Sequence, residues 1–311
     1  MKNFKIIAIV LLFVFILLGF FMFDDAQEQQ VKKPLVSVST FSLYDITKHI
    51  AEDSVELVNM LPFGVDPHSF ELTPKTMTKI EKSALIFYSG AGLEPWVESI
   101  SFKKVPIDMS HYVKLRELDS DEFEFHKHHD AQCAHNKLDP HYWLDFKNMQ
   151  KMAVVITKEL ITILPQNREI YKHNRDAYLK MLEELDARYK KELATCKLRN
   201  IIVNHNSLGY LGHRYHFHAE SLSGLSPEAE PTSSDIKRIL QEIKKDGVST
   251  IFYESFINDK VMQSISKDTH VKADVIQPLG NITADEARTG ATYESLMLEN
   301  LEKLSKAMIC R

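Results

Sequence analysis

The sequence PQNREIYKHNRDAYLKMLEELDARYKKELATC, residues 165–196, decides how the chain is organised. Its apolar residues recur every three or four positions, which predicts one continuous amphipathic helix. Pro165 is tolerated in the first turn of a helix, and Glu184 with Arg188 forms a pair that stabilises the exposed face. Such a helix would be roughly 45 Å long, which is longer than a small domain needs internally. We therefore expect it to join two domains.

Short apolar runs alternate with helical patterns on both sides of this helix. Before it, strands are expected at residues 35–39, 55–61, 84–89 and 104–107, and helices at 44–51, 74–82, 94–100 and 149–164. After it, strands are expected at 200–204, 248–254 and 273–277, and helices at 232–244, 261–267 and 293–309. Strands that alternate with helices form mainly parallel sheets. The predicted fold class is α/β, with two lobes, each a mainly parallel sheet flanked by helices, joined by one long rigid linker helix.

These elements predict four parts of the chain. Residues 34–148 form an N-terminal α/β lobe with a histidine-rich loop at 125–137, residues 149–197 form linker helices, and residues 198–311 form a C-terminal α/β lobe. Residues 1–33 are interpreted as a signal peptide or an N-terminal membrane anchor and tether, because two lysines precede an apolar run over 6–23. That run is nearly long enough to cross a membrane and no small-residue cleavage site follows it, so cleavage and retention both remain open.

The composition describes an ordinary globular protein that acts outside the cytoplasm. Of the residues, 44% are hydrophobic and 26% are charged, and the net charge is −5 with no concentrated run of Lys and Arg, which argues against a nucleic-acid partner. Three cysteines are too few for a disulfide scaffold, but one bridge can form in an oxidising compartment, with Cys196 and Cys310 as one candidate pair. Cys133, the first cysteine, lies too far along the chain to carry a lipid at the signal boundary, and could be a metal thiolate, a disulfide partner or a bystander.

Histidines gather in residues 126–145, HKHHDAQCAHNKLDPHYWLD, which hold five of the protein's 14. Neutral imidazole is a good zinc ligand, so a cluster this dense indicates metal. The first half is polar and irregular, and its candidate accessory ligands are His126, His128, His129 and His135. The second half places His141 in a turn between a proline and bulky side chains, and the same Asp-Pro-His triplet occurs at His68.

Three histidines follow expected strands. His68 and His141 follow the second strand and the last segment of the first half, and His205 follows the strand at 200–204. Ligands of α/β sheets bind at the carboxyl ends of strands, in the crevice where two halves face each other. Three imidazoles there would form a zinc site with a fourth position open. His213, His216 and His218 are a weaker accessory candidate, with the last two on one face of a strand.

Five motifs occur in the order found in one family. They are Gly64-Val-Asp-Pro-His-Ser-Phe-Glu71, Asp139-Pro-His-Tyr-Trp-Leu-Asp145, His205-Asn-Ser-Leu-Gly-Tyr-Leu-Gly-His-Arg-Tyr215, Ser226-Pro-Glu-Ala-Glu-Pro231 and Tyr253-Glu-Ser255. From Leu35 to the C-terminus the chain resembles the zinc- and manganese-binding solute-binding proteins of bacterial ABC importers. The resemblance implies a periplasmic or surface-held receptor that delivers a divalent metal to an inner-membrane ABC permease. If the N-terminal segment is not cleaved, it tethers the receptor to the inner membrane.

The resemblance also implies the ligands and the metal. It assigns His68, His141 and His205 as the ligands and the long helix as a rigid linker that permits only modest closure. Manganese members usually have a carboxylate at the position of His205, so histidine there favours Zn²⁺ as the transported ion. The histidine-rich loop is also a feature of zinc members, although a solvated insert with no metal role remains an alternative. A monomer is expected.

Two features leave the details open. Many members have an aspartate before Pro-Leu-Gly, but this chain has Gln277, a poorer zinc ligand, so water or a loop histidine is expected in the fourth position. Asp66, Glu71 and Asp139 are candidates to orient the imidazoles. The rival functions are a manganese receptor of the same family, a metal buffer that depends on the loop, and a zinc hydrolase or lyase, against which no HExxH motif occurs.

Overall fold

The computed structural model describes residues 32–100, 102, 104–118, 137–224, 230–255 and 260–311, without the side chains of residues 98 and 99. Residues from Pro34 to Arg311 form one compact unit. The N-terminal apolar run, most of the histidine-rich loop with Cys133, and the motif at 226–231 except its last two residues lie outside the described residues. In the part of the chain that is described, no helix combines the length and the apolar character needed to span a membrane.

The first lobe is built on a four-stranded parallel sheet in the order β2-β1-β3-β4. The strands are β1 (Leu35–Val38), β2 (Glu56–Asn59), β3 (Leu85–Tyr88) and β4 (Ile107–Asp108). The helices are α2 (Phe41–Ala51) and α3 (Pro74–Ile80), with 3-10 turns η1 (Pro95–Ser99) and η2 (Met109–Tyr112). The expected helix at 94–100 is thus a 3-10 turn that begins at a proline.

The second lobe repeats this architecture with the order β10-β9-β7-β8, again all parallel. Its strands are β7 (Asn200–Val203), β8 (His218–Ser221), β9 (Thr250–Glu254) and β10 (Lys272–Ile276). Its helices are α7 (Gly209–Tyr215), α8 (Ser233–Asp246), α9 (Lys260–Thr269), α10 (Ala284–Arg288) and α11 (Tyr293–Ala307). Thr232 and Asp235 form a capping box at the start of α8, as expected. The α/β prediction with two parallel sheets is confirmed.

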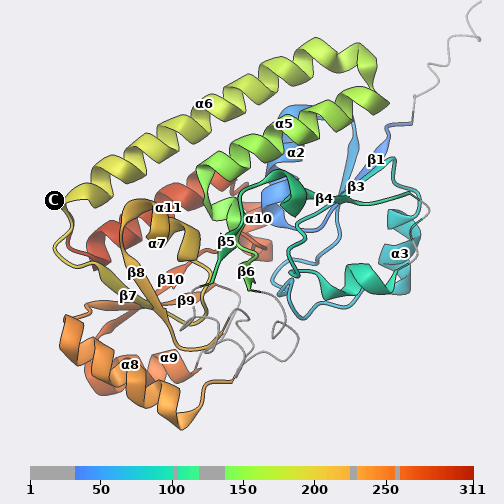
Figure 1. Cartoon of the computed structure of the whole chain (residues 1–311). Coiled ribbons are helices and arrows are strands. Elements are labelled where there is room, and N and C mark those ends of the chain that lie inside the picture. The colour runs from blue at the N-terminus through green and yellow to red at the C-terminus, as the bar shows by residue number, and fades with distance from the viewer. Residues whose placement is uncertain (1–31, 101, 103, 119–136, 225–229, 256–259) are drawn as a thin grey trace, which may run out of the picture. The chain divides into compact units, whose positions relative to one another are not determined.

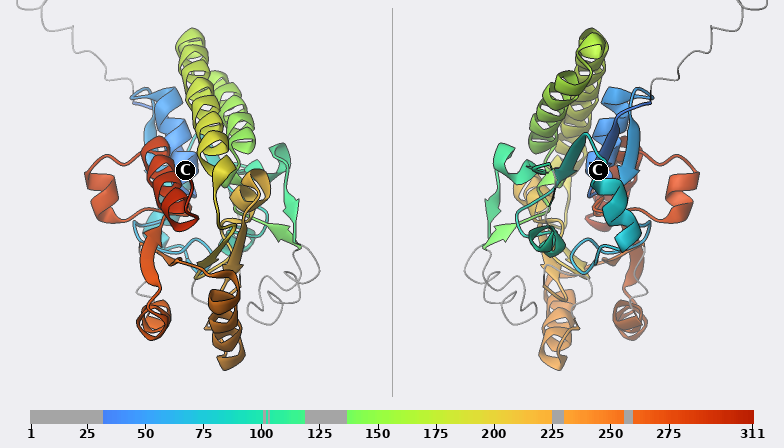
Figure 2. Two further views of the ribbon diagram at one scale, coloured as in Figure 1. Left: turned by 90° about the vertical axis from the view of Figure 1, so that its left-hand side faces the viewer. Right: turned by 90° about the vertical axis from the view of Figure 1, so that its right-hand side faces the viewer.

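The stretch that was expected as one helix at 165–196 is a long helix with a tighter turn at each end. The 3-10 turn η4 (Pro165–Asn167) leads into α6 (Arg168–Glu192), and η5 (Leu193–Thr195) follows. At 1.5 Å per residue, α6 is about 37 Å long. It lies along α5 (Phe146–Ile163) and packs on α2 of the first lobe and α11 of the second (Figure 1). The two views of Figure 2 show α5 and α6 side by side.

The two lobes share one hydrophobic core. The largest cluster of buried apolar side chains includes Val38 and Phe87 from the first sheet, Tyr189 from α6, and Phe252 and Ile276 from the second sheet. Because protein interiors are close-packed, a shared core resists movement of one lobe against the other.

Buried hydrogen bonds reinforce this connection. Asp45 of α2 accepts from the hydroxyl of Tyr178 in α6 at 2.8 Å and from the backbone N–H of Tyr293 at the start of α11 at 3.0 Å. The indole N–H of Trp143 donates to the carbonyl of Pro278 at 2.7 Å. These bonds join the first lobe to the long helix α6 and to the second lobe.

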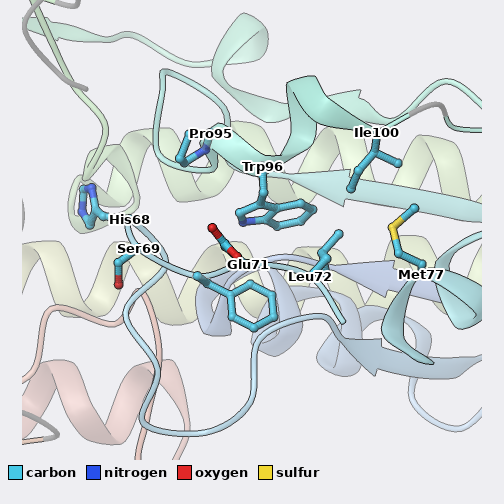
Figure 3. A pocket seen from close by; sticks show the side chains of 9 residues that line it. His68, Ser69, Glu71, Leu72, Met77, Pro95, Trp96 and Ile100 are labelled. Carbon is cyan, nitrogen blue, oxygen red and sulfur yellow. The ribbon is translucent and has the colours of Figure 1, made fainter. Parts of the chain in front are cut away.

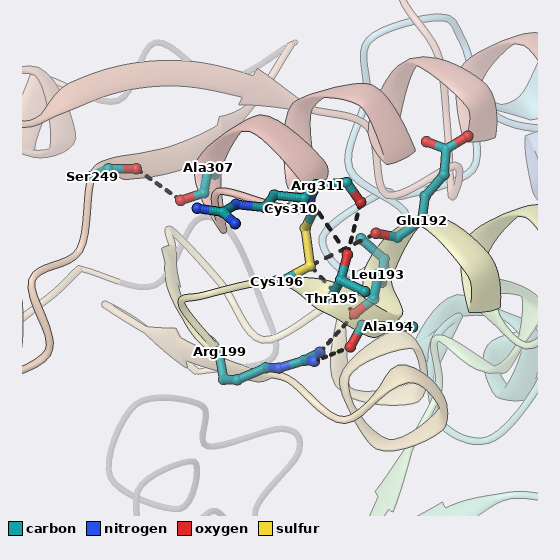
Figure 4. Close-up of a disulfide and its surroundings, with 10 residues drawn as sticks. All are labelled: Glu192, Leu193, Ala194, Thr195, Cys196, Arg199, Ser249, Ala307, Cys310 and Arg311. Atoms are coloured by element: carbon teal, nitrogen blue, oxygen red, sulfur yellow. Dashed lines mark hydrogen bonds between the residues drawn. A yellow bond between two sulfur atoms is a disulfide. The ribbon is translucent and has the colours of Figure 1, made fainter.

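A disulfide joins Cys196, just after η5, to Cys310 at the C-terminus (Figure 4). The candidate pair is therefore confirmed. The bridge closes a loop across 114 positions of sequence, and the hydroxyl of Thr195 donates to the carbonyl of Arg311 beside it. The C-terminal residues are thereby fixed to the end of the long helix.

Three elements of the second lobe, α7, β8 and α10, were not expected, and the first two correct one interpretation of the histidines. His216 ends α7 in the left-handed conformation, whereas His218 begins β8, so the two side chains do not share a strand face. Both are exposed, and His218 Nε2 contacts Glu220 Oε2 at 2.9 Å. Within the described residues they do not form a metal cluster.

Candidate metal centre

Three histidine side chains converge between the two sheets. One ring nitrogen from each of His68, His141 and His205 lies within 4.8 Å of the others, and this is the only such cluster of His, Cys, Asp or Glu among the described residues. The Nε2 atoms of His68 and His141 are 3.4 Å apart, and the ring centroids of His141 and His205 are 5.3 Å apart. All three residues are at most 8% exposed. The structure thus brings together the three histidines that sequence analysis selected.

The repeated Asp-Pro-His triplet forms the same local turn twice. The backbone N–H of His68 donates to Oδ1 of Asp66 at 3.1 Å, and the N–H of His141 donates to Oδ1 of Asp139 at 2.9 Å. An aspartate that accepts a hydrogen bond from the backbone two residues later is an Asx turn, which fixes the histidine backbone without help from distant residues. The triplet therefore encodes the placement of two of the three imidazoles.

Asp139 also orients the ring of His141. Its Oδ1 contacts Nδ1 of that ring at 2.9 Å, so Nε2 is the nitrogen directed at the other histidines. Metal-ligating histidines usually donate their second nitrogen to a carboxylate in this way, which fixes the tautomer. Asp139 is fully buried. This carboxylate was one of three orienting candidates in the sequence.

Arg116 holds Asp139 from the opposite side. Its Nε and Nη2 donate to Oδ2 of Asp139 at 3.2 and 3.0 Å. Burial alone would raise the pKa of Asp139, but the hydrogen bond from His141 and the charges of His141 and Arg116 outweigh it and hold the pKa below its usual range. Tyr210 of α7 completes the arrangement, because its hydroxyl donates to the carbonyl of Asp139 and accepts from the N–H of Arg116.

Gly209 allows this arrangement to form. A Cβ added there would lie within 2.7 Å of both Cζ of Arg116 and Oδ2 of Asp139. Atoms at that separation overlap, so a side chain at this position would push the ion pair apart. The glycine thus lets α7 approach the ion pair that orients His141.

His205 is oriented by a different carboxylate. Oε1 of Glu254, at the end of β9, lies in contact with Nδ1 of the His205 ring. The Glu254 residue is 1% exposed, and burial followed by the negative charge of Asp66 raises its pKa well above the ordinary value. Sequence analysis quoted Glu254 in a motif but gave it no role. The parallel strands β7 and β9 bring it beside His205, since Val203 is in register with Phe252.

The environment keeps His68 neutral. Burial, and secondly the charge of His141, lower the pKa of His68 to about 3, although Asp139 acts in the opposite direction. Only a neutral imidazole has a lone pair for a metal ion. His68 is therefore in the ligating form throughout the physiological pH range.

The space among the histidines fits one small species. They line a cavity of about 10 Å³, which also borders Asp66, Glu254 and Trp143. A void of this size holds a single water molecule. A metal ion with a water or one further donor matches both the volume and the nitrogen-rich lining.

Gln277 takes no part in this cavity. Its amide nitrogen donates to Ser255 Oγ at 3.1 Å and to Glu286 Oε1 at 2.9 Å, and its oxygen accepts from the N–H of Leu279 at 3.3 Å. The expectation that Gln277 does not supply the fourth donor agrees with these contacts.

A second cavity of about 360 Å³ adjoins His68 on its other side. Figure 3 shows His68 and Ser69 at one end, with Glu71 beneath the indole of Trp96 and Met77 at the far end. Glu71 is exposed and lies on this wall, not among the histidines, so the prediction that it orients an imidazole has no supporting contact among the described residues. The loop candidates His126, His128, His129 and His135 lie outside the described residues.

Comparison with known proteins agrees with the fold. The Zn(II)-bound ZnuA-like domain of Streptococcus pneumoniae AdcA has 26% sequence identity and a TM-score of 0.73, and the match covers 89% of this chain and 99% of that domain. The fold is thus that of the two-lobed α/β metal-binding proteins. More narrowly, the chain belongs to the ZnuA family, zinc-uptake complex component A, periplasmic, whose model matches residues 36–307.

Two curated relatives extend the comparison. The zinc-binding lipoprotein AdcA of Streptococcus pneumoniae strain R6 is 28% identical over 295 residues, which are 93% of this chain but 59% of AdcA. The high-affinity zinc uptake system protein ZnuA of Bacillus subtilis is 28% identical over 280 residues, 88% of each chain. The chain thus spans little more than half of the first relative and most of the second.

Proposed function

We propose that this protein is an extracytoplasmic zinc receptor. It captures Zn²⁺ with His68, His141 and His205 in the cleft between its two lobes and delivers the ion to an ABC permease in the inner membrane. The convergence of three buried imidazoles carries this proposal. The names of the relatives support the metal and the transport role.

The proposed parts of the chain follow from the same assignment. Residues 34–148 and 198–311 are the two lobes and residues 149–197 are the linker that holds them. Residues 1–33 direct export and, if they are not cleaved, tether the receptor to the inner membrane beside its permease. The His-rich loop at 125–137 gathers zinc for the centre, and the receptor acts as a monomer.

Zinc is favoured over manganese by the donor atoms. Three nitrogen donors suit zinc, whereas manganese prefers carboxylate and other oxygen ligands. Asp139 and Glu254 contact the Nδ1 atoms of His141 and His205. Contacts of this kind orient ligating imidazoles.

Binding is favoured over catalysis by the names of the relatives, which refer to zinc binding and zinc uptake. The sequence also has no HExxH motif. Zinc-dependent hydrolysis by the purified protein that is lost in His205→Ala would overturn this conclusion.

The decisive experiment measures metal affinity by competition with a chelator of known affinity. His205→Ala should weaken zinc binding by at least about 100-fold, because a three-nitrogen site becomes a two-nitrogen one. His173→Ala is the matched control, since His173 is exposed on α6 and is not part of the cluster, and should bind as the unchanged protein does. A preference for manganese over zinc would contradict the assignment.

Deletion of residues 125–137 separates the centre from the loop. Tight binding of one zinc should survive the deletion, while additional weak binding disappears. Loss of tight binding with His68, His141 and His205 intact would favour a loop-based buffer. Delivery is tested by growth on limiting zinc in a strain with and without the permease, in which His205→Ala should fail to support uptake.

A further inference from the structure

A cavity of about 610 Å³ lies beside Arg116, away from the three histidines. Its walls come from both lobes and from α5. The residues that line it are Lys114, Leu115, Arg116, Glu117, Asp145, Lys147, Asn148, Lys151, Tyr210, His213, Arg214 and His216. Cationic groups thus outnumber carboxylates around it, in a protein whose net charge is −5.

Three lysines at this cavity lack acidic partners. Within the described part of the chain, the ammonium groups of Lys114 and Lys151 have no hydrogen-bond or ion-pair partner, and that of Lys147 contacts only Gln150 at 3.3 Å. Several other exposed lysines pair with carboxylates, as Lys48 does with Asp53. Like charges that are held together without a counterion favour the binding of an anion.

The two carboxylates of the lining do not neutralise this charge. Asp145 caps α5 by accepting from the backbone N–H groups of Lys147 and Asn148, at 2.7 and 3.3 Å, and lies 3.5 Å from Nη1 of Arg214. Glu117 is exposed at the edge. Both arginines of the lining already have carboxylate partners, because Arg214 donates from Nε and Nη2 to Asp186 and Arg116 donates to Asp139. The lysines are therefore the excess charge.

The walls are held in place by buried polar contacts. The side chain of Asn148, 2% exposed, accepts from the N–H of Lys114 and donates to its carbonyl, both at 2.9 Å. This pair of bonds fixes Lys114 beside Lys147 and Lys151, which lie four residues apart on one face of α5. The hydroxyl of Tyr210 fixes α7 to Arg116 from the other lobe. A preorganised site loses less entropy when a ligand binds.

We propose that this cavity binds a phosphate- or sulfate-type oxyanion, held by Lys114, Lys147 and Lys151. Ammonium and guanidinium groups form their strongest hydrogen bonds with such anions. The volume exceeds that of a single tetrahedral anion, so a phosphate that carries a substituent also fits. The source is either a free oxyanion or the headgroup of an anionic phospholipid at the membrane surface.

Arg116 connects this cavity with the metal centre. It lines the cavity and holds Asp139, which in turn contacts Nδ1 of His141. An anion beside Arg116 partly offsets the positive charge that the guanidinium exerts on Asp139. The negative charge of Asp139 then acts more strongly on the His141 ring and makes this imidazole a stronger donor to a cation. Since coupling between binding sites is reciprocal, zinc should also strengthen anion binding. This link rests on the proposed zinc function, whereas the anion site does not.

Sulfate titration of the zinc-free protein tests the site. Residues 34–311, the whole compact unit, are followed by amide NMR while sulfate replaces chloride at constant ionic strength; sulfate is used because it complexes zinc weakly. Saturable shifts are expected at the amides of Lys114, Lys147 and Lys151. Lys147→Gln/Lys151→Gln should weaken binding by about tenfold or more, since two charge-assisted contacts are lost. Lys237→Gln/Lys244→Gln removes the same charge from exposed positions of α8 and should change nothing.

Three results decide the proposal. The double variant Lys147→Gln/Lys151→Gln is called the α5 variant. Saturable amide shifts on sulfate addition that disappear in the α5 variant, but not in the α8 control, support a free oxyanion as the ligand. Co-sedimentation with phosphatidylglycerol vesicles but not phosphatidylcholine vesicles, lost in the α5 variant alone, supports a lipid headgroup. Neither response, or equal loss in both double variants, overturns the site. In zinc competition assays sulfate should tighten binding by roughly two- to fivefold, and an unchanged affinity would refute the link through Arg116.

Discussion

Asp139→Asn should separate the orientation of a zinc ligand from the stability of the fold. The aspartate carries two pairs of contacts, one from the backbone and ring of His141 and one from the guanidinium of Arg116. Asparagine has one acceptor oxygen and one donor group, so it can satisfy only one pair. The amide is also neutral and does not strengthen the imidazole as a donor.

The expected loss has two parts. Outer carboxylates of this kind typically contribute 10- to 100-fold to metal affinity, which corresponds to about 1.4 to 2.7 kcal/mol. Stability should fall by about 3 kcal/mol, because the guanidinium of Arg116 loses its buried partner. Chelator competition measures the first part, and thermal unfolding of the zinc-free protein measures the second.

Asp45→Asn is the matched control. Asp45 is also a buried carboxylate, and it joins α2 to Tyr178 and Tyr293 away from the histidines. Its replacement should lower stability by a similar amount but leave zinc affinity within about twofold, since no ligand contacts it. If both variants lost zinc affinity equally, or if Asp139→Asn bound zinc like the unchanged protein, the orienting role of Asp139 would be refuted.

Three further perturbations have defined outcomes. Gly209→Ala should lower the free energy of unfolding by about 1–3 kcal/mol and should also lower zinc affinity, since the new methyl group displaces the ion pair behind His141. Melting curves and chelator competition that match the unchanged protein would contradict this. Replacing Cys196 and Cys310 together by serine should lower the free energy of unfolding by up to about 4–5 kcal/mol in the chain-entropy model. Thermal unfolding under oxidising conditions measures this loss, and chelator competition should show an unchanged zinc affinity. Burial raises the pKa of Glu94 to about 7, despite hydrogen bonds that lower it. Stability should therefore fall by about 3 kcal/mol as the pH rises from 4.5 through 7, and Glu94→Gln should flatten that dependence.

Periodicity predicted most of the fold because most elements bury one face. The long helix was predicted from its apolar spacing, and Tyr171, Tyr178, Leu182, Leu185 and Tyr189 are indeed its buried stripe. The turns at its ends were missed, since a helical repeat does not distinguish a 3-10 turn from an α-turn over three residues. The helix α7 and strand β8 were missed because each is short and lies in a stretch where polar and aromatic residues alternate.

The cationic cavity could not be predicted from the sequence. Its lysines come from positions 114, 147 and 151, and its arginines from positions 116 and 214, so no run of basic residues marks it. The absence of such a run was interpreted as the absence of a basic face. That inference fails when folding brings single cations from separate segments together, since charge density on a surface depends on the distances between groups in space.

The three histidines show why one part of a site can be predicted and another cannot. The backbones of His68 and His141 are fixed by the aspartate two positions earlier, so the Asp-Pro-His triplet contains both the ligand and the residue that holds it. His205 has no such triplet, and its support is Glu254, 49 positions away in the sequence. That contact exists only because β7 and β9 are neighbours in register. Local turns are therefore recognisable from sequence alone, whereas a partner across a sheet requires the strand order, which periodicity does not determine.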